Sequence, residues 1–383
     1  MATNVLITGG AGFIGYHTAN KLVENGCHVR VLDNLSKQIH PDPEESLSRL
    51  NPSVKFMCGD VRNRSQLMAA LENIEFVYHF AAETGVGQSM YEIARYSDVT
   101  IQGTAVLCDC IALRKGHVKK VILSSSRAVY GEGQYLCKNC GIVKPIPRKR
   151  IQLVAGEWNI FCPQCNAEII PLGCQETSSR RPTSIYGLTK KVQEDLLSIV
   201  SATYRIPLVI LRYFNVFGPR QSISNPYTGV LSIFSSLLLH NKEIEIYEDG
   251  QMVRDFVSIE EVVTANLKVL EKDVSEVLLL NIGSGKQRTI LQLANYLKDE
   301  IGSKSKINIT GRYRIGDIRH SYADVSKQTE YIGTVPGKDF QVSIRNLIDW
   351  AEREGKCIDL DQSIAELSDF GLSGTAKDSS YSK

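Results

Sequence analysis

Tyr186 and Lys190 are the residues whose types and spacing best suit acid–base chemistry. They stand four positions apart in an amphipathic stretch that runs to about Tyr204, so a helix would place both on one face. An ammonium group near a phenol stabilises the phenolate, which lowers the pKa of the tyrosine and suits it to act as a general base. A helix can also carry this pair by chance. The pair gains weight from Ser126, a hydroxyl at the end of an expected strand, and from the nucleotide site described next.

A glycine-rich turn near the N-terminus has the spacing of a phosphate-binding loop. Gly9, Gly12 and Gly15 follow a short apolar run and precede an amphipathic stretch. This order predicts a buried strand, a tight turn and the start of a helix, which together present backbone N–H groups and a positive helix end to a pyrophosphate. Gly9 permits the turn, Gly12 lets phosphate approach the backbone, and Gly15 lets the helix pack closely on the strand.

Asp33 adds a second feature of a dinucleotide site. It ends the next expected strand, about 20 residues beyond the glycine loop, where a carboxylate can accept hydrogen bonds from both ribose hydroxyls. Asn34 rather than an arginine follows it, which favours NAD over NADP. A glycine triplet alone is weak evidence, and an α/β turn beside an exposed aspartate is the alternative. The two features together favour the nucleotide site.

Four cysteines form two Cys-x-x-Cys pairs in a segment at 133–176. Cys137 and Cys140 make the first pair and Cys162 and Cys165 the second, and each pair precedes a residue that tolerates positive φ. The pattern is typical of the two knuckles of a zinc ribbon, in which four thiolates close a structural site. Two redox pairs, or core cysteines without metal, are the alternatives that the spacing disfavours. The basic run at 148–150 between the pairs is expected to be a solvated loop.

Alternating patterns of strand and helix surround these residues. Strands are expected at 5–7, 28–32, 54–57, 76–80, 121–123 and 208–211, with helices such as 65–71, 93–113 and 186–204. This order predicts an α/β fold with a doubly wound parallel sheet, whose ligand crevice lies at the carboxyl ends of the strands. Asp60, Ala81 and Ser126 would project into that crevice, although each alone could be a plain strand-end residue.

The last third of the chain mixes short strands with helices. Strands are expected at 244–247, 255–258 and 277–282, and helices at 259–270 and 290–301. Loops here carry Arg220, Arg254 and Arg314, which could neutralise a second diphosphate, although single arginines are usually surface charges. The tail beyond Leu360 is polar and ends in a serine-rich run, so we expect it to be frayed or disordered.

Composition places the chain among ordinary globular proteins. Of its 383 residues, 43% are apolar and 22% charged. A net charge of +2 provides no basic field for nucleic acid, and no apolar run reaches membrane-spanning length. We therefore expect a cytoplasmic protein without nucleic-acid or membrane partners. Disulfides are disfavoured in that compartment, so the ten cysteines need another explanation.

A series of motifs resembles the extended short-chain dehydrogenase/reductases, specifically the nucleotide-sugar epimerases and dehydratases. They are TGGAGFIG at 8–15, DN at 33–34, GDV at 59–61, HFAA at 79–82, SSSRAVYG at 124–131, the YxxxK spacing at 186–190, LRYFNVFGPRQ at 211–221, RDFVSIEEVV at 254–263 and NIGSG at 281–285. They cover nearly everything from residue 4 to about 350 apart from the cysteine segment. One departure is Gln102, where the family usually has asparagine.

The resemblance implies a domain plan and a likeness to a smaller group. It implies an NAD-binding Rossmann domain at 1–217 that carries the zinc-ribbon-like insertion at 133–176. A mainly substrate-binding domain would follow at 218–355 and a partly disordered tail at 356–383, with 239–273 packing back on the first domain. GVGQSMYEIARY at 85–96, SNPYTGV at 224–230 and the four-cysteine insertion resemble the group described as dTDP-L-rhamnose 4-epimerases. The helices 93–113 and 186–204 correspond to those of the family's homodimer interface.

The resemblance also implies roles for individual residues. NAD binding falls to Gly9, Gly12, Phe13, Ile14, Gly15, Asp33, Asn34, Asp60, Val61, Ala81, Ala82, Ser124, Tyr186 and Lys190. Tyr186 resembles the catalytic base, Lys190 its pKa-lowering partner and ribose ligand, and Ser126 the hydroxyl that bonds the reacting sugar oxygen. Binding of the nucleotide sugar falls to Ser126, Asn215, Arg220, Arg254 and Arg314.

Two positions after Ser126 narrow the implied reaction. Family dehydratases place an acidic pair where this chain has Arg127 and Ala128, decarboxylases also use an acid there, and epimerases at C3 and C5 use a Cys–Lys pair. The reaction that remains is removal and return of a hydride at C4 of the sugar. Its expected substrate and product are dTDP-L-rhamnose and dTDP-6-deoxy-L-talose. Uronate 4-epimerases also resemble this chain, but they carry an arginine at the position of Ser222. A UDP-hexose or uronate 4-epimerase, a reductase or dehydrogenase, and a non-catalytic binding module are the alternatives.

Overall fold

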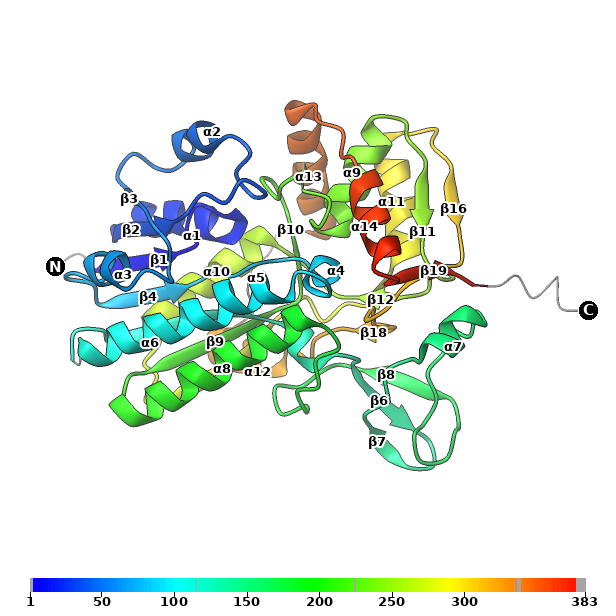
Figure 1. Ribbon diagram of the computed structural model, residues 1–383, viewed down its shortest axis with the longest axis horizontal. Helices are drawn as coiled ribbons and strands as arrows, with labels where there is room; N and C mark the ends of the chain where they lie inside the picture. The colour runs from blue at the N-terminus through cyan, green and yellow to red at the C-terminus, as the bar shows by residue number, and fades with distance from the viewer. Residues whose placement is uncertain (1–2, 115, 224, 334, 336–338, 377–383) are drawn as a thin grey trace, which may run out of the picture.

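A seven-stranded sheet, with every neighbouring pair parallel, forms the centre of the structure, a computed structural model (Figure 1). The structure describes residues 3–114, 116–223, 225–333, 335 and 339–376. Ser224 of the SNPYTGV motif and residues 377–383 of the expected tail lie outside this set. The strands are β1 (Asn4–Thr8), β2 (His28–Asp33), β3 (Lys55–Cys58), β4 (Phe76–His79), β5 (Lys120–Ser126), β9 (Leu208–Tyr213) and β14 (Val277–Ile282). Their order, β14-β9-β5-β4-β1-β2-β3, confirms the predicted doubly wound fold.

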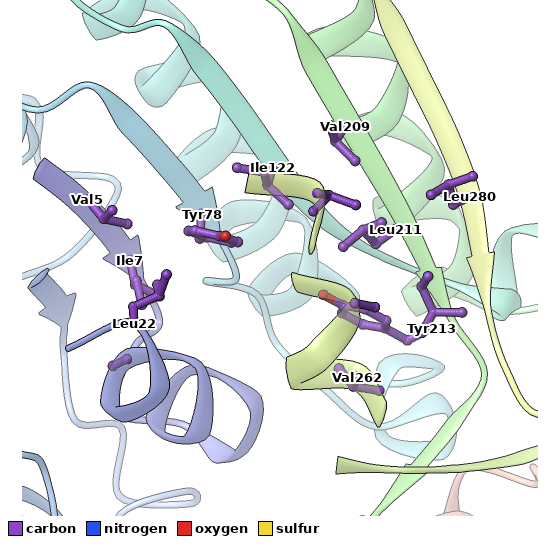
Figure 2. Packing of buried hydrophobic residues seen from close by; sticks show 14 of the residues in the cluster. Val5, Ile7, Leu22, Tyr78, Ile122, Val209, Leu211, Tyr213, Val262 and Leu280 are labelled. Carbon is purple, nitrogen blue, oxygen red and sulfur yellow. The ribbon is translucent and has the colours of Figure 1, made fainter. Parts of the chain in front are cut away.

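Helices cover both faces of this sheet because its strands are apolar on both sides. Val5 and Ile7 of β1 pack toward α1 (Phe13–Glu24) and α10 (Ile259–Glu271), as Figure 2 shows for this cluster. Leu6, between them, faces the other way and packs with residues of α3 (Arg64–Ala70), α6 (Gly103–Leu113) and α8 (Ile185–Tyr204). The strand ends that carry the candidate site therefore stand on a rigid scaffold.

The helix expected at 93–113 contains a change of winding. It begins as α5 (Ile93–Ser97), passes through a π-helical segment (Asp98–Gln102) and continues as α6. Gln102, the departure from the family pattern, is the last residue of the π segment. Such segments often occur beside functional sites, and Val99 within this one lines the main cavity.

A second hydrophobic core lies beyond the sheet. It joins α9 (Val230–Leu239), α11 (Ile290–Ile301) and α13 (Phe340–Glu354) with β11 (Ile244–Ile246), which pairs with β16 (Ile307–Ile309). The segment 239–273, which we expect to pack back on the first domain, contributes to both cores. Its helix α10 joins the sheet core, whereas Ile244 and Ile246 are fully buried in the second core.

The described part of the C-terminal tail contains regular elements beyond Leu360, where we expect a frayed segment. Helix α14 (Asp361–Asp369) buries Leu367, and β19 (Ser373–Thr375) pairs with β17 (Arg312–Arg314). These long-range contacts supply the burial and hydrogen bonds that the polar tail lacks by itself. The remaining elements are α2 (Pro43–Ser48), α4 (Val86–Ser89), β10 (Asn215–Phe217), β12 (Val253–Arg254), β13 (Phe256–Ser258), β15 (Arg288–Thr289), β18 (His320–Ser321) and α12 (Ser326–Ile332).

The cysteine-bearing insertion is a small unit with its own sheet. After the 3-10 turn η2 (Arg127–Tyr130), β6 (Gln134–Cys137) pairs antiparallel with β7 (Gly141–Val143) and β8 (Ile169–Leu172), and α7 (Arg150–Val154) follows β7 in the chain. Figure 1 shows the unit projecting beside the start of α8. It thus lies in the chain between Ser126 and Tyr186. Among the described helices, none is both long and apolar enough to cross a membrane.

Candidate active site

A cavity of about 450 Å³ runs along the carboxyl ends of the central strands. Its size is that of a small-molecule site. It is lined by sixteen of the residues predicted to bind cofactor or substrate: Gly9, Gly12, Phe13, Ile14, Gly15, Asp33, Asn34, Asp60, Val61, Ala81, Ala82, Ser124, Ser126, Tyr186, Lys190 and Arg220. The structure therefore brings these residues into one place.

Any side chain on Gly9 or Gly15 of the glycine loop would clash with nearby backbone. Gly9 has a φ of +69°, and a Cβ there would lie 2.7 Å from the backbone nitrogen of Ala81. A Cβ on Gly15 would lie 2.4 Å from the carbonyl oxygen of Gly9. Helix α1 starts after Gly12 without a side-chain cap, so its first N–H groups remain available. This cradle fits the pyrophosphate of a dinucleotide.

Asp33 is fixed by backbone donors at the end of β2. Its Oδ2 accepts from the N–H of Ala11 at 3.0 Å, and its Oδ1 accepts from the N–H of Leu35 at 2.9 Å. Each carboxylate oxygen has further acceptor capacity, so both can still accept a ribose hydroxyl. The same contact ties the glycine loop to the second strand.

Asp60 is held ionised in the same cavity. Arg62 donates to its carboxylate at 2.7 Å and 2.9 Å, and Asn34 donates through Nδ2 at 3.1 Å. These hydrogen bonds, those of Arg62 first, lower the pKa of Asp60 to about 2. Asn34 and Asp60 therefore present one polar wall at the ends of β2 and β3.

Ser126 and Tyr186 meet although the insertion separates them in the chain. Ser184 caps α8 by accepting from the N–H of Gly187 at 3.1 Å, which places Tyr186 in the first helical turn. The N–H of Tyr186 donates to Ser89 Oγ at 3.0 Å. The side chains of Ser126 and Tyr186 are hydrogen-bonded. A serine hydroxyl and a phenol thus face the same point of the cavity.

The charge that acts on the Tyr186 phenol comes from Arg127. Burial raises the pKa of Tyr186, whereas the hydrogen bond with Ser126 and the positive charge of Arg127 lower it. Lys190, expected to be the pKa-lowering partner, instead donates from Nζ to the carbonyl oxygen of Ser124 at 2.9 Å. Burial lowers the pKa of Lys190 to about 7, against the opposing charge of Glu194. We had assigned Arg127 no role, and its place directly after Ser126 was the available signal.

A smaller hollow of about 230 Å³ opens beside Ser126 and Tyr186. Arg127 is the one charged residue among the described residues that line it. The Oδ1 of Asn215 is buried there without a hydrogen-bond partner among the described residues. An unpaired buried acceptor in a hollow needs a donor from a ligand or water. The rest of the lining mixes polar side chains with apolar ones; the apolar ones are Val86, Phe214, Val216, Phe217, Val230, Leu231 and Phe256.

Of the three predicted arginine ligands, Arg220 lines the main cavity. Its guanidinium lies over the ring of Tyr16, 4.3 Å from the ring centroid, near the start of α1. Arg220 has a left-handed backbone with a φ of 71°. It therefore lies on the glycine-loop side of the main cavity, and it is not among the residues that line the smaller hollow.

Arg254 lines neither hollow, contrary to expectation. It is buried, and its guanidinium donates to the backbone carbonyls of Val253, Ile318 and Arg319 at 2.8, 2.7 and 3.0 Å. These three hydrogen bonds hold the guanidinium against the backbone of residues 253 and 318–319.

Arg314 lies outside both hollows as well. Its Nε pairs with Asp317 at 2.9 Å, and its side chain is 43% exposed. It also lies over the ring of Tyr247. The guanidinium of Arg314 therefore forms an ion pair with Asp317 and does not point into the cavity.

Arg148, which we had placed in a solvated loop, is buried between the insertion and the rest of the chain. Its side chain is 2% exposed and pairs with Glu248 at 2.7 Å. It also donates to the carbonyl of Asp317 at 3.0 Å. Asp317 is in turn the carboxylate that most supports the charge of Arg127. The insertion is therefore linked to the group beside Tyr186.

The four cysteines of the insertion converge on one point. The sulfurs of Cys137, Cys140, Cys162 and Cys165 all lie within 4.8 Å of one another, and those of Cys137 and Cys165 are 3.5 Å apart. Tetrahedral zinc with Zn–S bonds of about 2.3 Å requires sulfurs roughly 3.8 Å apart. The positive φ predicted after each pair occurs at Gly141 (74°) and Asn166 (56°). The donor set and its geometry fit a closed structural zinc site.

Comparisons with known proteins find a family model and relatives that match most of the chain. The family model described as the NAD dependent epimerase/dehydratase family matches residues 5–145 and 165–283. The break between the matched stretches falls inside the four-cysteine insertion. A curated dTDP-L-rhamnose 4-epimerase of Burkholderia thailandensis is 37% identical over 352 residues, covering 91% of this chain and 95% of its own length.

Two solved structures of nucleotide-sugar 4-epimerases are also similar to this chain over most of its length. The UDP-glucose 4-epimerase of Thermotoga maritima, solved with UDP-glucose, has a TM-score of 0.73 at 31% identity and covers 92% of this chain and 100% of its own. The UDP-glucuronic acid 4-epimerase of Bacillus cereus, solved with UDP-glucuronic acid and NAD, has a TM-score of 0.75 at 25% identity with the same coverage.

Proposed function

The chain belongs to the NAD dependent epimerase/dehydratase family and is an NAD-dependent epimerase of nucleotide sugars, and from this we propose that it interconverts dTDP-L-rhamnose and its C4 epimer, dTDP-6-deoxy-L-talose. The smaller hollow carries the proposal. Beside Ser126 and Tyr186 its described lining combines polar groups with apolar side chains such as Val86, Leu231 and Phe256, and it lacks a carboxylate. The apolar side chains can contact a methyl group at C6, and without a carboxylate the hollow offers no further acid or base for chemistry at C5.

The residues of the chain handle the proton of the C4 hydroxyl. The phenolate of Tyr186 takes this proton, and the hydroxyl of Ser126 donates a hydrogen bond to the reacting sugar oxygen. Bound NAD supplies the hydride acceptor that is regenerated in each cycle. Tyr186 then returns the proton after the keto-sugar has presented its other face.

Isotope labelling tests the reaction. The protein is incubated with dTDP-L-rhamnose that carries deuterium at C4, and the products are analysed by NMR. We expect dTDP-6-deoxy-L-talose that retains deuterium at C4, with no solvent label at C3 or C5 and no net NADH. Solvent label at C5, or NADH in proportion to a keto-sugar, would show a different reaction. If the protein turns over a UDP-sugar but not dTDP-L-rhamnose, the assignment of the dTDP-sugar is wrong while the epimerase activity stands.

UDP-glucuronate is the second candidate, and Arg127 favours it. A guanidinium in the sugar hollow can pair with a carboxylate at C6. Asp317 already supports the charge of Arg127, however, and Ser222 stands where uronate epimerases carry a further arginine. Direct competition between the two nucleotide sugars decides which has the larger kcat/KM.

Two further features belong to the proposal. The cysteine cluster holds one structural zinc ion. None of the ten cysteines forms a disulfide, which suits the reducing cytoplasm.

The chain forms a homodimer through α6 and α8, whose exposed apolar side chains include Leu113 (62%), Leu188 (44%) and Ile199 (66%). Sedimentation of the parent beside Ile199→Asp tests the dimer. A monomeric parent would reject it.

A further inference from the structure

The C-terminal helix α14 reaches the wall of the sugar site through one carboxylate. Oε2 of Glu366 accepts hydrogen bonds from the hydroxyls of Tyr91 and Tyr227, each at 2.6 Å. The two phenol oxygens are also in contact with each other, and with one proton apiece they share Glu366 as their acceptor. Tyr227 lines both the main cavity and the smaller hollow. A residue far along the chain therefore holds a side chain of the site.

The surroundings of Glu366 make this contact specific. The ring of Phe370 stacks on Tyr91, with centroids 4.9 Å apart and planes 9° apart. Gln362 donates to the other carboxylate oxygen, Oε1, at 2.8 Å. Both oxygens of Glu366 are thus engaged, and the hydrogen bonds of Tyr227 and Tyr91 hold its pKa below the usual range.

The segment that carries Glu366 is anchored at its far end. β19 pairs with β17, with Thr375 opposite Arg312 and Ser373 opposite Arg314. Arg150 of the insertion donates to the carbonyl oxygen of Gly371. Residues 361–375 therefore run from the cysteine-bearing insertion to the sugar hollow.

We propose that Glu366 is a positioning residue for the nucleotide sugar, and that it acts by holding Tyr227 in the wall of the sugar hollow. The inference rests on the proposed function because it needs a nucleotide sugar in that hollow. Burial, followed by the carboxylate of Glu366, raises the pKa of Tyr227 to about 12, so the phenol keeps the proton that it donates. Without Glu366 the two phenols lose their shared acceptor, and the side chain of Tyr227 has several orientations available. Binding of the sugar must then select one of them.

We expect the loss of Glu366 to change KM for the nucleotide sugar rather than kcat. Glu366 and Tyr91 line neither hollow, and the proton-transferring groups are Ser126 and Tyr186. Glu366→Ala should raise KM for the nucleotide sugar roughly tenfold, which corresponds to about 1.4 kcal/mol. kcat should stay within about twofold, and NAD content should not change.

Three variants test the proposal on the holoenzyme. Asp369→Ala, which removes an exposed acid from the same helix, is the matched control and should behave as the parent. Glu366→Gln should largely restore KM, because its amide oxygen can still accept from both phenols while Gln362 turns its own amide. Tyr227→Phe in the Glu366→Ala background should add little, because the two residues act through one contact.

The outcomes separate this inference from the proposed function. The assay uses dTDP-L-rhamnose and, beside it, UDP-glucose. If the parent turns over neither, the proposed function fails. If the parent turns over either and Glu366→Ala leaves that KM unchanged, or lowers kcat alone, the positioning role fails. An equal rise of KM in Glu366→Ala and Asp369→Ala would also overturn it, because the effect would then follow helix charge rather than Tyr227.

Discussion

Lys190 Nζ lies 2.9 Å from the carbonyl oxygen of Ser124, and this hydrogen bond joins α8 to the end of β5. It holds the first two turns of the helix against the strand that carries Ser126. The lysine therefore orients Tyr186 through the backbone, while Arg127 supplies positive charge to the phenol. Among the described residues, Arg127 is thus the cation that lowers the pKa of Tyr186, while Lys190 fixes the helix that carries it.

Arg127 is expected to set the pH dependence of the reaction. Its removal in Arg127→Gln should raise the pKa of Tyr186, because an opposite charge beside the phenolate is lost. A general base works only when deprotonated, so the acidic limb of the kcat/KM profile should move to higher pH. Arg127→Lys keeps the charge and should move the limb less. Identical limbs in parent and Arg127→Gln would contradict this role.

Tyr186→Phe should lower kcat on the order of a thousandfold, the scale of a lost general base. The phenylalanine keeps the ring and its packing, so folding and NAD content should match the parent. Circular dichroism and the absorbance of released nucleotide provide those controls. Retention of more than about a tenth of kcat would rule out Tyr186 as the base.

Asp33→Ala should weaken NAD far more than NADP. The parent carboxylate accepts ribose hydroxyls but would repel a 2′-phosphate, so NADP should be a poor substitute for NAD. Fluorescence titration of cofactor-free protein measures both affinities. The variant also loses the bond from the N–H of Ala11, which tends to weaken both cofactors alike, so the informative quantity is the NAD-to-NADP ratio. Equal affinities in the parent would contradict the assignment.

The parent should contain about one zinc ion per chain, and Cys137→Ser with Cys162→Ser should contain none. Elemental analysis of protein purified without chelator measures this. Cys58→Ser, at an exposed cysteine outside the cluster, is the matched control and should keep its zinc. Zinc loss should lower the melting temperature of the insertion, while turnover changes only through the rim of the site. Full zinc in the double variant would place the metal elsewhere.

His79 should make the fold less stable in acid. It is 1% exposed, with Nδ1 2.8 Å from Thr8 Oγ1 and Nε2 3.0 Å from Thr104 Oγ1. Burial, followed by the charge of Lys190, lowers its pKa from 6.5 to about 3. Between these values the unfolded chain binds a proton that the folded chain does not, so stability falls as pH falls below 6.5.

At pH 5 the loss from His79 should be about 2 kcal/mol. Urea unfolding at pH 7 and pH 5 measures it. His79→Gln, which keeps hydrogen-bonding groups without a titrating ring, should show a smaller difference between the two pH values. His28→Gln, at an exposed histidine, is the control and should behave as the parent. A parent equally stable at both pH values would contradict the prediction.

The sequence was sufficient wherever structure depends on neighbours in the chain. The glycine loop, Asp33 and the strands of the central sheet were predictable because apolar periodicity and turn residues are local signals. The position of Arg254 was not, because its guanidinium donates to the carbonyls of Ile318 and Arg319, which are about 65 positions away in the chain. Arg314 pairs with Asp317, three residues on, a local contact that we had not weighed. Helix α14 was missed for the same reason as the position of Arg254, since its partners Tyr91 and Tyr227 are distant in the chain.

The place of the insertion also affects the entropy of folding. Ser126 and Tyr186 must meet at the two ends of a long connection, and closing a loop costs more conformational entropy as the loop lengthens. A metal that joins Cys137 to Cys165, 28 positions apart, removes roughly half of that connection from the loop that must close. Each halving lowers the closure cost by about 0.6 kcal/mol. For the folding chain, the metal-bound insertion thus behaves as a much shorter tether between the serine and the tyrosine.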